Sequence, residues 1–228
     1  DFLIALRQVP PRDLSMTPAQ IRAENAAQAD LSAMLVEDVE IDRVVDVEIP
    51  VTDGTIGARI YHPVAGDNRP THVYFHGGGF IMGSVDSSDR STRMIAARTG
   101  LSIVSVDYRL APEFRWPTAP DDCYAATCWV AEHADEYGLD ATAMSVGGES
   151  AGGNLAAVVA LMCRDRGGPE LLAQWLSIPV FDMTMPESPS LERFGKGFGL
   201  DYDEIVYCGD HFIAEADRAH PYASPVFA

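Results

Sequence analysis

The sequence predicts an α/β fold with a mixed, mostly parallel sheet that helices cover on both faces. Short apolar runs alternate with longer helical patterns through most of the chain, as in a sheet whose strands are joined by helices. The later apolar runs are continuous, which is typical of parallel strands buried on both faces. An antiparallel pair of strands is expected to open the sheet, so the sheet is mixed.

The first elements expected are a helix and a hairpin. Residues 17–20 read Thr-Pro-Ala-Gln, a capping box with proline at the first helical position, and the helix should run to about Leu35. Strands are expected at about 44–51 and 56–61. Asp53-Gly54 between them is a dipeptide typical of a hairpin turn.

The central part of the chain predicts four further strands and the helices that join them. The strands are expected at residues 73–75, 102–106, 144–146 and 175–180. The helices are expected at residues 88–98, 119–136 and 151–166. Gly167-Gly168 ends the last of these helices. Together they make a sheet with helical connections.

The pattern changes after Phe181. Residues 182–200 are rich in Pro, Gly, Ser and Met, so they predict an irregular loop. Residues 201–204 read Asp-Tyr-Asp-Glu and should cap a helix that runs to about Ala216.

The most informative stretch is residues 147–153, which read GGESAGG. It follows a short apolar run and leads straight into a helical pattern. Gly148 and Gly152 stand two residues before and after Ser150, as a strained strand-to-helix turn requires where strand and helix pass closely. Such a turn lifts a serine hydroxyl to the end of a sheet, above a helix N-terminus that favours negative charge. Ser150 is therefore the candidate nucleophile.

A second glycine cluster, residues 76–79, reads His-Gly-Gly-Gly and ends the apolar run of residues 73–75. Such a cluster frees backbone N–H groups to point at one spot, as an oxyanion hole requires. Three glycines alone would favour a tight loop that only closes a strand. The Ser150 turn downstream in the same chain favours the oxyanion hole.

A third segment indicates a family. Residues 106–113 read VDYRLAPE, follow the apolar run 101–104 and lead into residues 117–126. The three segments together resemble the hormone-sensitive-lipase-like branch of the α/β-hydrolases, the bacterial carboxylesterases with an HGGG motif. The resemblance continues to residues 221–225, PYASP.

The resemblance implies an α/β-hydrolase fold made as one domain over residues 1–228. The core sheet and helices would occupy about 44–183. Elements of a helical cap over the site would occupy about 1–43 and 184–218.

The resemblance also implies roles at the site. Ser150 would attack an ester carbonyl, and water would then hydrolyse the acyl-enzyme. The backbone oxyanion donors would be Gly77, Gly78 and Ala151. The residues that shape the surrounding loops would be His76, Gly79, Gly148, Gly152 and Glu149. Relatives commonly carry aspartate where this chain has Glu149, which leaves the contacts of that side chain open.

The chain departs from the family pattern near its end. The family places its triad acid in an Asp-Pro-Leu-type motif and its histidine in a His-Gly-Phe-type motif, and this sequence contains neither. The remaining histidines are interpreted as structural or surface residues: His62, His72, His133, His211 and His220. We therefore expect the C-terminal portion, with the last two strands, the acid and the base, to lie beyond Ala228. The strand at 175–180 should then have an unpaired apolar edge.

The sequence also suggests an ion pair and a set of apolar side chains that could line a pocket. Arg109 and Glu113 are expected to pair and fix the loop after the fourth strand. Four side chains either line an acyl or alcohol pocket or pack on the surface of their loop: Met183, Met185, Phe194 and Phe198.

Charge and composition disfavour several classes of protein. The formal net charge is −18, and an acidic surface repels phosphate backbones and anionic membranes, so nucleic acid is not an expected partner. No apolar run reaches the length of a membrane span. Lys196 is the only lysine, which disfavours phosphate-binding loops and pyridoxal phosphate enzymes. No cofactor is expected.

The four cysteines are Cys123, Cys128, Cys163 and Cys208. They lack metal-ligand spacing, so no metal site is expected. Buried free thiols are expected instead, which indicates a reducing cytoplasm.

The expected function is a carboxylic ester hydrolase that acts on small or short-chain acyl esters. Two alternatives stay open: a catalytically incomplete, receptor-like binding protein on the same fold, and an acyltransferase that uses the same residues. The partner is a small-molecule ester, and the resemblance leaves a homodimer open.

Overall fold

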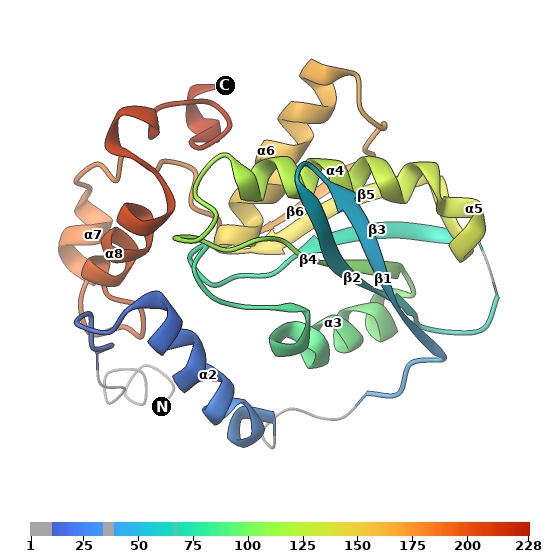
Figure 1. Cartoon of the computed structure of the whole chain (residues 1–228), viewed down its shortest axis with the longest axis horizontal. Helices are drawn as coiled ribbons and strands as arrows, with labels where there is room; N and C mark the ends of the chain where they lie inside the picture. Colours follow the sequence, from blue (N-terminus) through green and yellow to red (C-terminus); the bar gives the residue numbers. More distant parts are fainter. Residues whose placement is uncertain (1–10, 34–38, 67) are drawn as a thin grey trace.

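A six-stranded sheet forms the centre of the chain in the computed structural model, which describes residues 11–33, 39–66 and 68–228 (Figure 1). The order along the sheet is β1-β2-β4-β3-β5-β6. The strands are β1 (Arg43–Val51), β2 (Gly54–His62), β3 (Arg69–Phe75), β4 (Ser102–Asp107), β5 (Leu139–Glu149) and β6 (Ala173–Ser177). β2 pairs antiparallel with β1 and β4, and the other pairs are parallel. The predicted mixed, mostly parallel sheet is confirmed.

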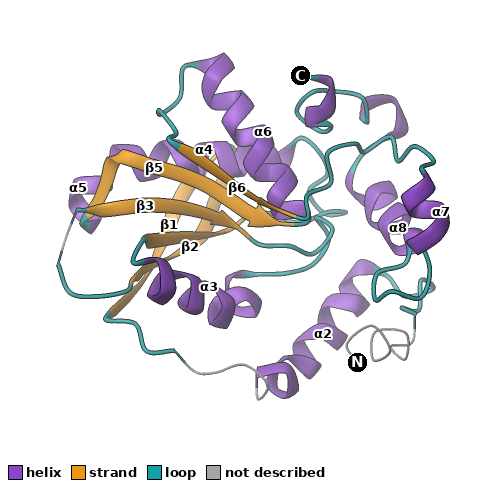
Figure 2. Ribbon diagram, turned by 180° about the vertical axis from the view of Figure 1, so that it is seen from behind, coloured by secondary structure: helices purple, strands orange, loops and turns teal. Residues whose placement is uncertain are grey.

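Helices cover both faces of this sheet. α3 (Val85–Thr99) lies on one face, and α4 (Thr118–Glu132) and α6 (Ala151–Arg166) lie on the other (Figures 1 and 2). Alternate side chains of one strand point to opposite faces. In β4, Ile103 packs in the α3-side cluster and Val104 in the larger cluster with α4 and α6, and both are fully buried. Burial on both faces explains the continuous apolar runs.

The helix predicted at the start of the chain is α2 (Pro18–Ala33). Its capping box is confirmed, because the Thr17 N–H donates to Gln20 Oε1 at 2.8 Å and the Gln20 N–H donates to Thr17 Oγ1 at 3.3 Å. The predicted end near Leu35 lies outside the described residues.

Two element boundaries differ from their predictions. Gly54 pairs with Val51 in the β1–β2 register, so the hairpin turn is formed by Thr52 and Asp53, one residue earlier than predicted. The helix predicted over 119–136 is divided into α4 and the short α5 (Ala134–Tyr137). His133 interrupts it with φ −108 and ψ 10, and its Nδ1–H donates to Trp129 O at 2.9 Å.

The region after Phe181 is more ordered than the composition predicts. A short helix, α7 (Pro189–Phe194), lies inside the predicted loop, and Ser188 Oγ caps it by accepting from the Leu191 N–H at 3.2 Å. α8 (Tyr202–Phe212) ends before the predicted Ala216. The backbone at Ile213 turns extended and buries this side chain in the core, so tertiary packing ends the helix.

The last strand lies at an edge of the described sheet. β6 pairs with β5 alone among the described strands. It ends at Ser177, three residues before the predicted end, because Ile178 adopts a left-handed φ of 41. Leu172, Trp175 and Ile178 are exposed along this edge.

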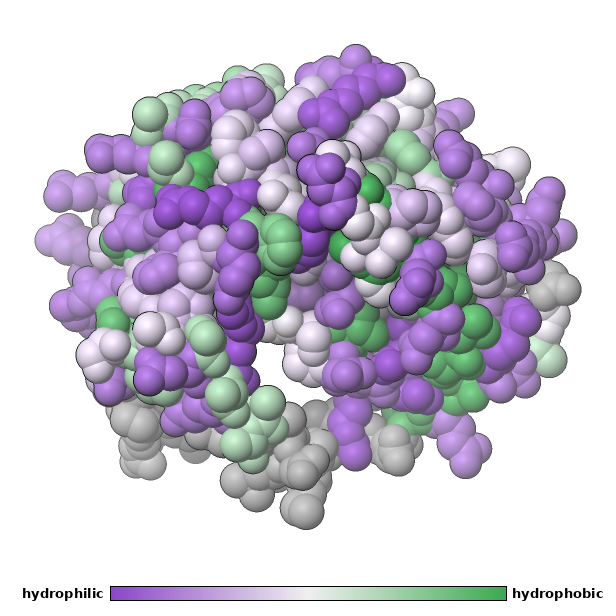
Figure 3. Space-filling view, in the orientation of Figure 1, coloured by the Kyte–Doolittle hydropathy of each residue, from purple (hydrophilic) through white to green (hydrophobic). Residues whose placement is uncertain are grey.

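Hydrophilic side chains cover much of the face of the molecule in Figure 3. No helix among residues 11–33, 39–66 and 68–228 combines the length and apolarity that a membrane crossing needs. All four cysteines are free. Cys123 and Cys163 are buried as predicted, whereas Cys128 and Cys208 are only partly buried.

Buried His72 is expected to make the stability of the protein depend on pH. Its Nδ1 lies 2.8 Å from Ser145 Oγ, and burial lowers its pKa from 6.5 to about 4. The folded state therefore holds a neutral ring, and the unfolded chain binds a proton below pH 6.5. Between pH 7.5 and pH 5.0 this group alone should lower the free energy of unfolding by about 2 kcal/mol.

Urea unfolding of the wild type and of His72→Asn at pH 7.5 and pH 5.0 measures this contribution. The variant should lose about 2 kcal/mol less between the two pH values than the wild type does. An equal loss in both proteins would show that His72 does not titrate in this way.

Candidate active site

Ser150 occupies a strained turn between β5 and α6. Its φ is 54 and its ψ is −114, values that a side chain bearing Cβ rarely adopts. The Ser150 N–H donates to Ser177 O at the end of β6 at 2.9 Å, and Ser150 O accepts the N–H of Asn154 at 3.0 Å in the first turn of α6. The predicted strand-turn-helix geometry is confirmed.

The flanking glycines are required by a close approach to β3. A Cβ on Gly148 would lie 2.3 Å from Phe75 O, and a Cβ on Gly152 would lie 1.9 Å from the same oxygen. Both distances are far inside van der Waals contact. Only glycine at both positions lets the start of α6 pass the end of β3 at this distance.

The His-Gly-Gly-Gly segment lies directly beside this turn. The Cβ position of Gly77 is 3.1 Å from Glu149 O and 3.8 Å from Ser150 Cβ. Gly78 has φ 125 and Gly79 has φ 60, so both need glycine. The structure thus brings together the two motifs that lie about seventy residues apart in the sequence.

The buried His76 side chain supports this loop through a hydrogen bond. It is buried, its Nδ1–H donates to Gly77 O at 2.8 Å, and its ring stacks on Tyr108 at 4.3 Å between centroids. The Tyr108 hydroxyl donates to His76 O at 2.8 Å. Burial lowers the pKa of His76, which keeps the ring neutral.

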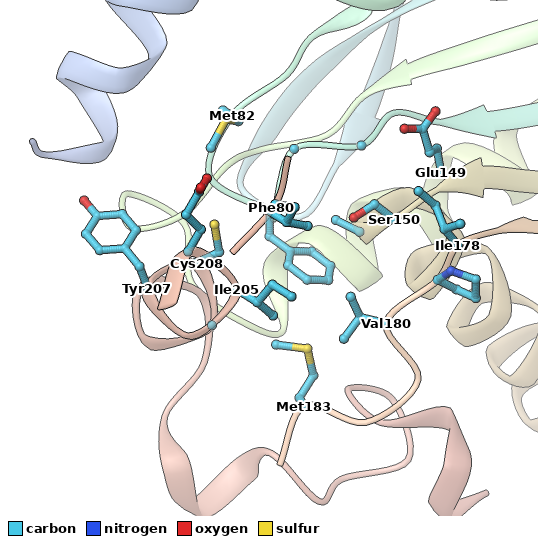
Figure 4. Close-up of a pocket in the computed structure, with 18 of the residues that line it drawn as sticks. Phe80, Met82, Glu149, Ser150, Ile178, Val180, Met183, Ile205, Tyr207 and Cys208 are labelled. Carbon is cyan, nitrogen blue, oxygen red and sulfur yellow. The ribbon is translucent and has the colours of Figure 1, made fainter. Parts of the chain in front are cut away.

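A cavity of about 610 Å³ opens beside Ser150, with mostly apolar walls (Figure 4). Phe80 and Ser150 lie on one side of it, and α8 supplies Ile205 and Cys208 on another. Glu149 lies at its rim, with the carboxylate pointing away from Ser150.

The four apolar side chains that the sequence left open divide into two pairs. Met183 and Met185 line the cavity. Phe194 and Phe198 do not line it in the described structure; they contact each other edge to face at 5.4 Å between ring centroids. Half of Phe194 is exposed, so this pair packs on the surface of its segment.

Several residues of this cavity were not predicted from the sequence. Arg12 and Glu204 line it and form an ion pair at 3.3 Å between Nε and Oε2. A Cβ on Gly79 would lie 2.5 Å from Cys208 Sγ, so α8 touches the glycine loop directly. These pairs are more than a hundred residues apart, and no local pattern in the sequence marks them.

No histidine in the described ranges lines the cavity. His133 and His211 donate to backbone carbonyls on their own helices, and His220 Nδ1 accepts the Tyr222 N–H at 3.0 Å. His62 and His72 are buried in strands. The interpretation of these residues as structural agrees with their places.

The predicted Arg109–Glu113 pair is wrong. Arg109 Nη2 lies 2.6 Å from Asp122 Oδ1, and its Nε donates to Asp122 Oδ2 at 2.9 Å. Glu113 pairs with Arg22 of α2. Asp122 is buried at the start of α4, beside the end of β4, so the fold brings it nearer than Glu113.

This architecture, a strained serine turn after a parallel strand beside a glycine loop, defines a class of α/β protein. A family model described as alpha/beta hydrolase fold matches residues 72–228. The match spans more than half of the chain, and the chain belongs to this family. The predicted fold class and family resemblance are confirmed.

Named relatives are esterases. The chain is 39% identical over 208 residues to the carboxylic ester hydrolase LipN of Mycobacterium tuberculosis, covering 88% of this chain and 55% of LipN. It is 41% identical over 186 residues to the esterase LipI of the same organism, covering 79% of this chain and 57% of LipI. The chain therefore spans little more than half the length of these relatives.

A solved structure extends the comparison. The hyperthermophilic esterase of the archaeon Pyrobaculum calidifontis superposes with a TM-score of 0.92 at 38% identity. The superposition covers 99% of this chain and 73% of that esterase.

Proposed function

We propose that the natural protein is a carboxylic ester hydrolase that works through an acyl-enzyme at Ser150. The strained turn that presents this hydroxyl to an apolar cavity, beside the glycine loop, carries the proposal. Ser150 Oγ attacks the ester carbonyl carbon and loses its proton, and the alcohol leaves with a proton. Water then attacks the acyl-enzyme, releases the carboxylic acid and restores the serine.

The negative charge of each tetrahedral intermediate is assigned to three backbone N–H groups, those of Gly77, Gly78 and Ala151. Ala151 is the first residue of α6, so its N–H has no partner within the helix and lies at the positive end of the helix dipole. Preorganised donors of this kind stabilise the transition state more than the ground state.

The contacts of the surrounding residues support the roles that we propose for them. His76 supports the loop through Gly77 O. Gly79 allows the loop to pack closely against α8, and Gly148 and Gly152 allow the serine turn to pack closely against the end of β3. Glu149 ends β5 and shapes the rim of the cavity.

The reaction also needs a base and an acid. Since no described histidine lines the cavity, we assign both to residues beyond Ala228, as expected from the sequence. A serine hydroxyl without a base is a weak nucleophile, so the proposed activity depends on these two residues.

Small or short-chain acyl esters are the proposed substrates. Apolar walls in a cavity of about 610 Å³ favour a neutral acyl or alcohol group of modest size. We also propose a cytoplasmic location, which the four free cysteines support.

We further propose that the N-terminal segment with α2 and the segment with α7 and α8 form a cap over this site, on a single domain. These segments lie together beyond one end of the sheet in Figures 1 and 2. Both line the cavity, through Arg12 and Leu14 from the first and Ile205 from the second.

Labelling with a fluorophosphonate tests the proposed function. The natural protein should gain one covalent adduct, which peptide mass spectrometry places on Ser150, and should hydrolyse p-nitrophenyl acetate. A receptor-like protein on the same fold would bind ligands without forming the adduct, and that outcome would refute the proposal. Added alcohol in the assay distinguishes hydrolysis from acyl transfer by its ester product.

The Arg12–Glu204 pair should affect which esters are accepted. Glu204→Gln would leave the Arg12 charge at the cavity wall without its carboxylate partner. We expect kcat/KM for p-nitrophenyl hydrogen succinate, divided by that for p-nitrophenyl butyrate, to rise about fivefold, which corresponds to about 1 kcal/mol.

Asp203→Asn is the matched control, because Asp203 lies next to Glu204 on α8 but pairs with Lys196 at the surface. Its ratio should equal that of the wild type. The same rise in both variants would reduce the effect to net charge and would contradict a local role for Arg12.

A further inference from the structure

Arg22 of α2 reaches from its helix to the segment that follows the glycine loop. Its Nη1 donates to Ile81 O at 2.9 Å and to Ala111 O at 3.2 Å. Its Nη2 bonds the carboxylate of Glu113. One guanidinium therefore joins three points on two loops that lie 59 and 89 residues away along the chain.

The Ile81 carbonyl is part of the turn that holds Gly78. The N–H groups of Ile81 and Met82 both donate to Gly78 O, at 3.2 Å and 3.0 Å. The peptide unit between Ile81 and Met82 thus accepts from Arg22 on one side and donates to Gly78 on the other. Hydrogen bonds linked through one peptide unit polarise and strengthen each other.

The second loop supports the same turn. The Ala111 N–H donates to Phe80 O at 2.9 Å, while Ala111 O accepts from Arg22. Phe80 has a left-handed φ of 65, a strained conformation that persists only where surrounding contacts hold it. Asn25, one helical turn after Arg22, adds a contact from its Nδ2 to Met82 Sδ at 3.3 Å.

We propose that Arg22 is a positioning residue for the oxyanion loop, which couples the docking of α2 to the direction of the Gly77 and Gly78 N–H groups. This inference rests on the proposed ester hydrolase function. Arg22 is not among the described residues that line the cavity, so it acts through Ile81 and Gly78. Removing it should disturb the transition state more than ground-state binding of the ester.

Steady-state kinetics of the natural protein with p-nitrophenyl acetate tests this, alongside urea unfolding of each variant. Arg22→Ala should lower kcat about 10-fold to 100-fold and change KM by less than about threefold, because oxyanion donors act in the transition state. The second-order rate of fluorophosphonate labelling should fall with kcat. Arg22→Lys keeps the charge but not the forked geometry, so it should restore only part of kcat.

Arg93→Ala is the matched control. The Arg93 side chain is 25% exposed against 26% for Arg22, and it pairs with Asp89 on α3. It should keep wild-type kcat. Where the alanine variant lowers the urea midpoint, Arg22→Gln, which retains the stem of the side chain, carries the kinetic comparison.

The possible results distinguish a failure of the proposed function from a failure of the role of Arg22. A wild-type protein that neither hydrolyses the ester nor reacts with the phosphonate would overturn the proposed function, and this inference with it. If the wild type is active but the folded Arg22 variants keep kcat within about twofold of it, or change only in KM, the role of Arg22 alone would be overturned.

Discussion

Replacing Ser150 with alanine is expected to lower kcat for p-nitrophenyl acetate by at least about a thousandfold in the natural protein. The substitution removes the atom that would form the acyl-enzyme, and only the proposed oxyanion donors of Gly77, Gly78 and Ala151 would remain. Alanine and serine tolerate the φ of 54 at this turn about equally, so the urea midpoint should change little. Steady-state hydrolysis and urea unfolding measure the two quantities.

Ser145→Ala provides the control for this substitution. Ser145 lies on β5, the strand that precedes Ser150, but its hydroxyl bonds His72 inside the protein and does not line the cavity. That variant should keep its activity and its phosphonate adduct. Hydrolysis retained by Ser150→Ala would show that Ser150 is not the nucleophile.

Gly152→Ala is expected to be the second most damaging change. Alanine inside a helix normally stabilises by about 1 kcal/mol relative to glycine. Here the added Cβ would lie 1.9 Å from Phe75 O and 2.7 Å from His76 O, and both atoms belong to backbone that cannot rotate away. We expect the free energy of unfolding to fall by about 3 kcal/mol.

The same substitution should also reduce activity beyond the loss of folded protein, because α6 must move away from β3 and carry Ser150 with it. Gly57→Ala on β2 is the control: its Cβ would lie 3.7 Å from Asp107 Cβ, an ordinary contact. Unfolding midpoints of Gly152→Ala and Gly57→Ala that agree within error would contradict the close approach of α6 and β3.

Much of the fold was predictable because its signals are local. Burial on two faces leaves a continuous apolar run, and a helix start leaves a capping residue such as Thr17. The turn at Ser150 needs glycine two residues away on either side, so the requirement appears directly in the sequence. The strands, most helices and the two glycine motifs were predicted for these reasons.

The predictions that were wrong concern features that depend on contacts between residues far apart in the sequence. α8 was predicted to continue to Ala216, but Ile213 leaves the helix to enter the core. Arg109 was paired with the acid nearest in sequence, whereas the buried Asp122 lies closer in the fold. Helix propensity and sequence spacing contain no information on either contact.

By itself, the sequence determined the sheet class, the serine turn and the glycine loop, since each depends on residues a few positions apart. The tertiary structure alone decided what surrounds them. Arg12 meets Glu204, Cys208 meets Gly79, and Arg22 reaches Ile81 only because α2 and α8 pack beyond the same end of the sheet. Such long-range side-chain contacts depend on how the elements pack, and no periodicity within one element encodes them.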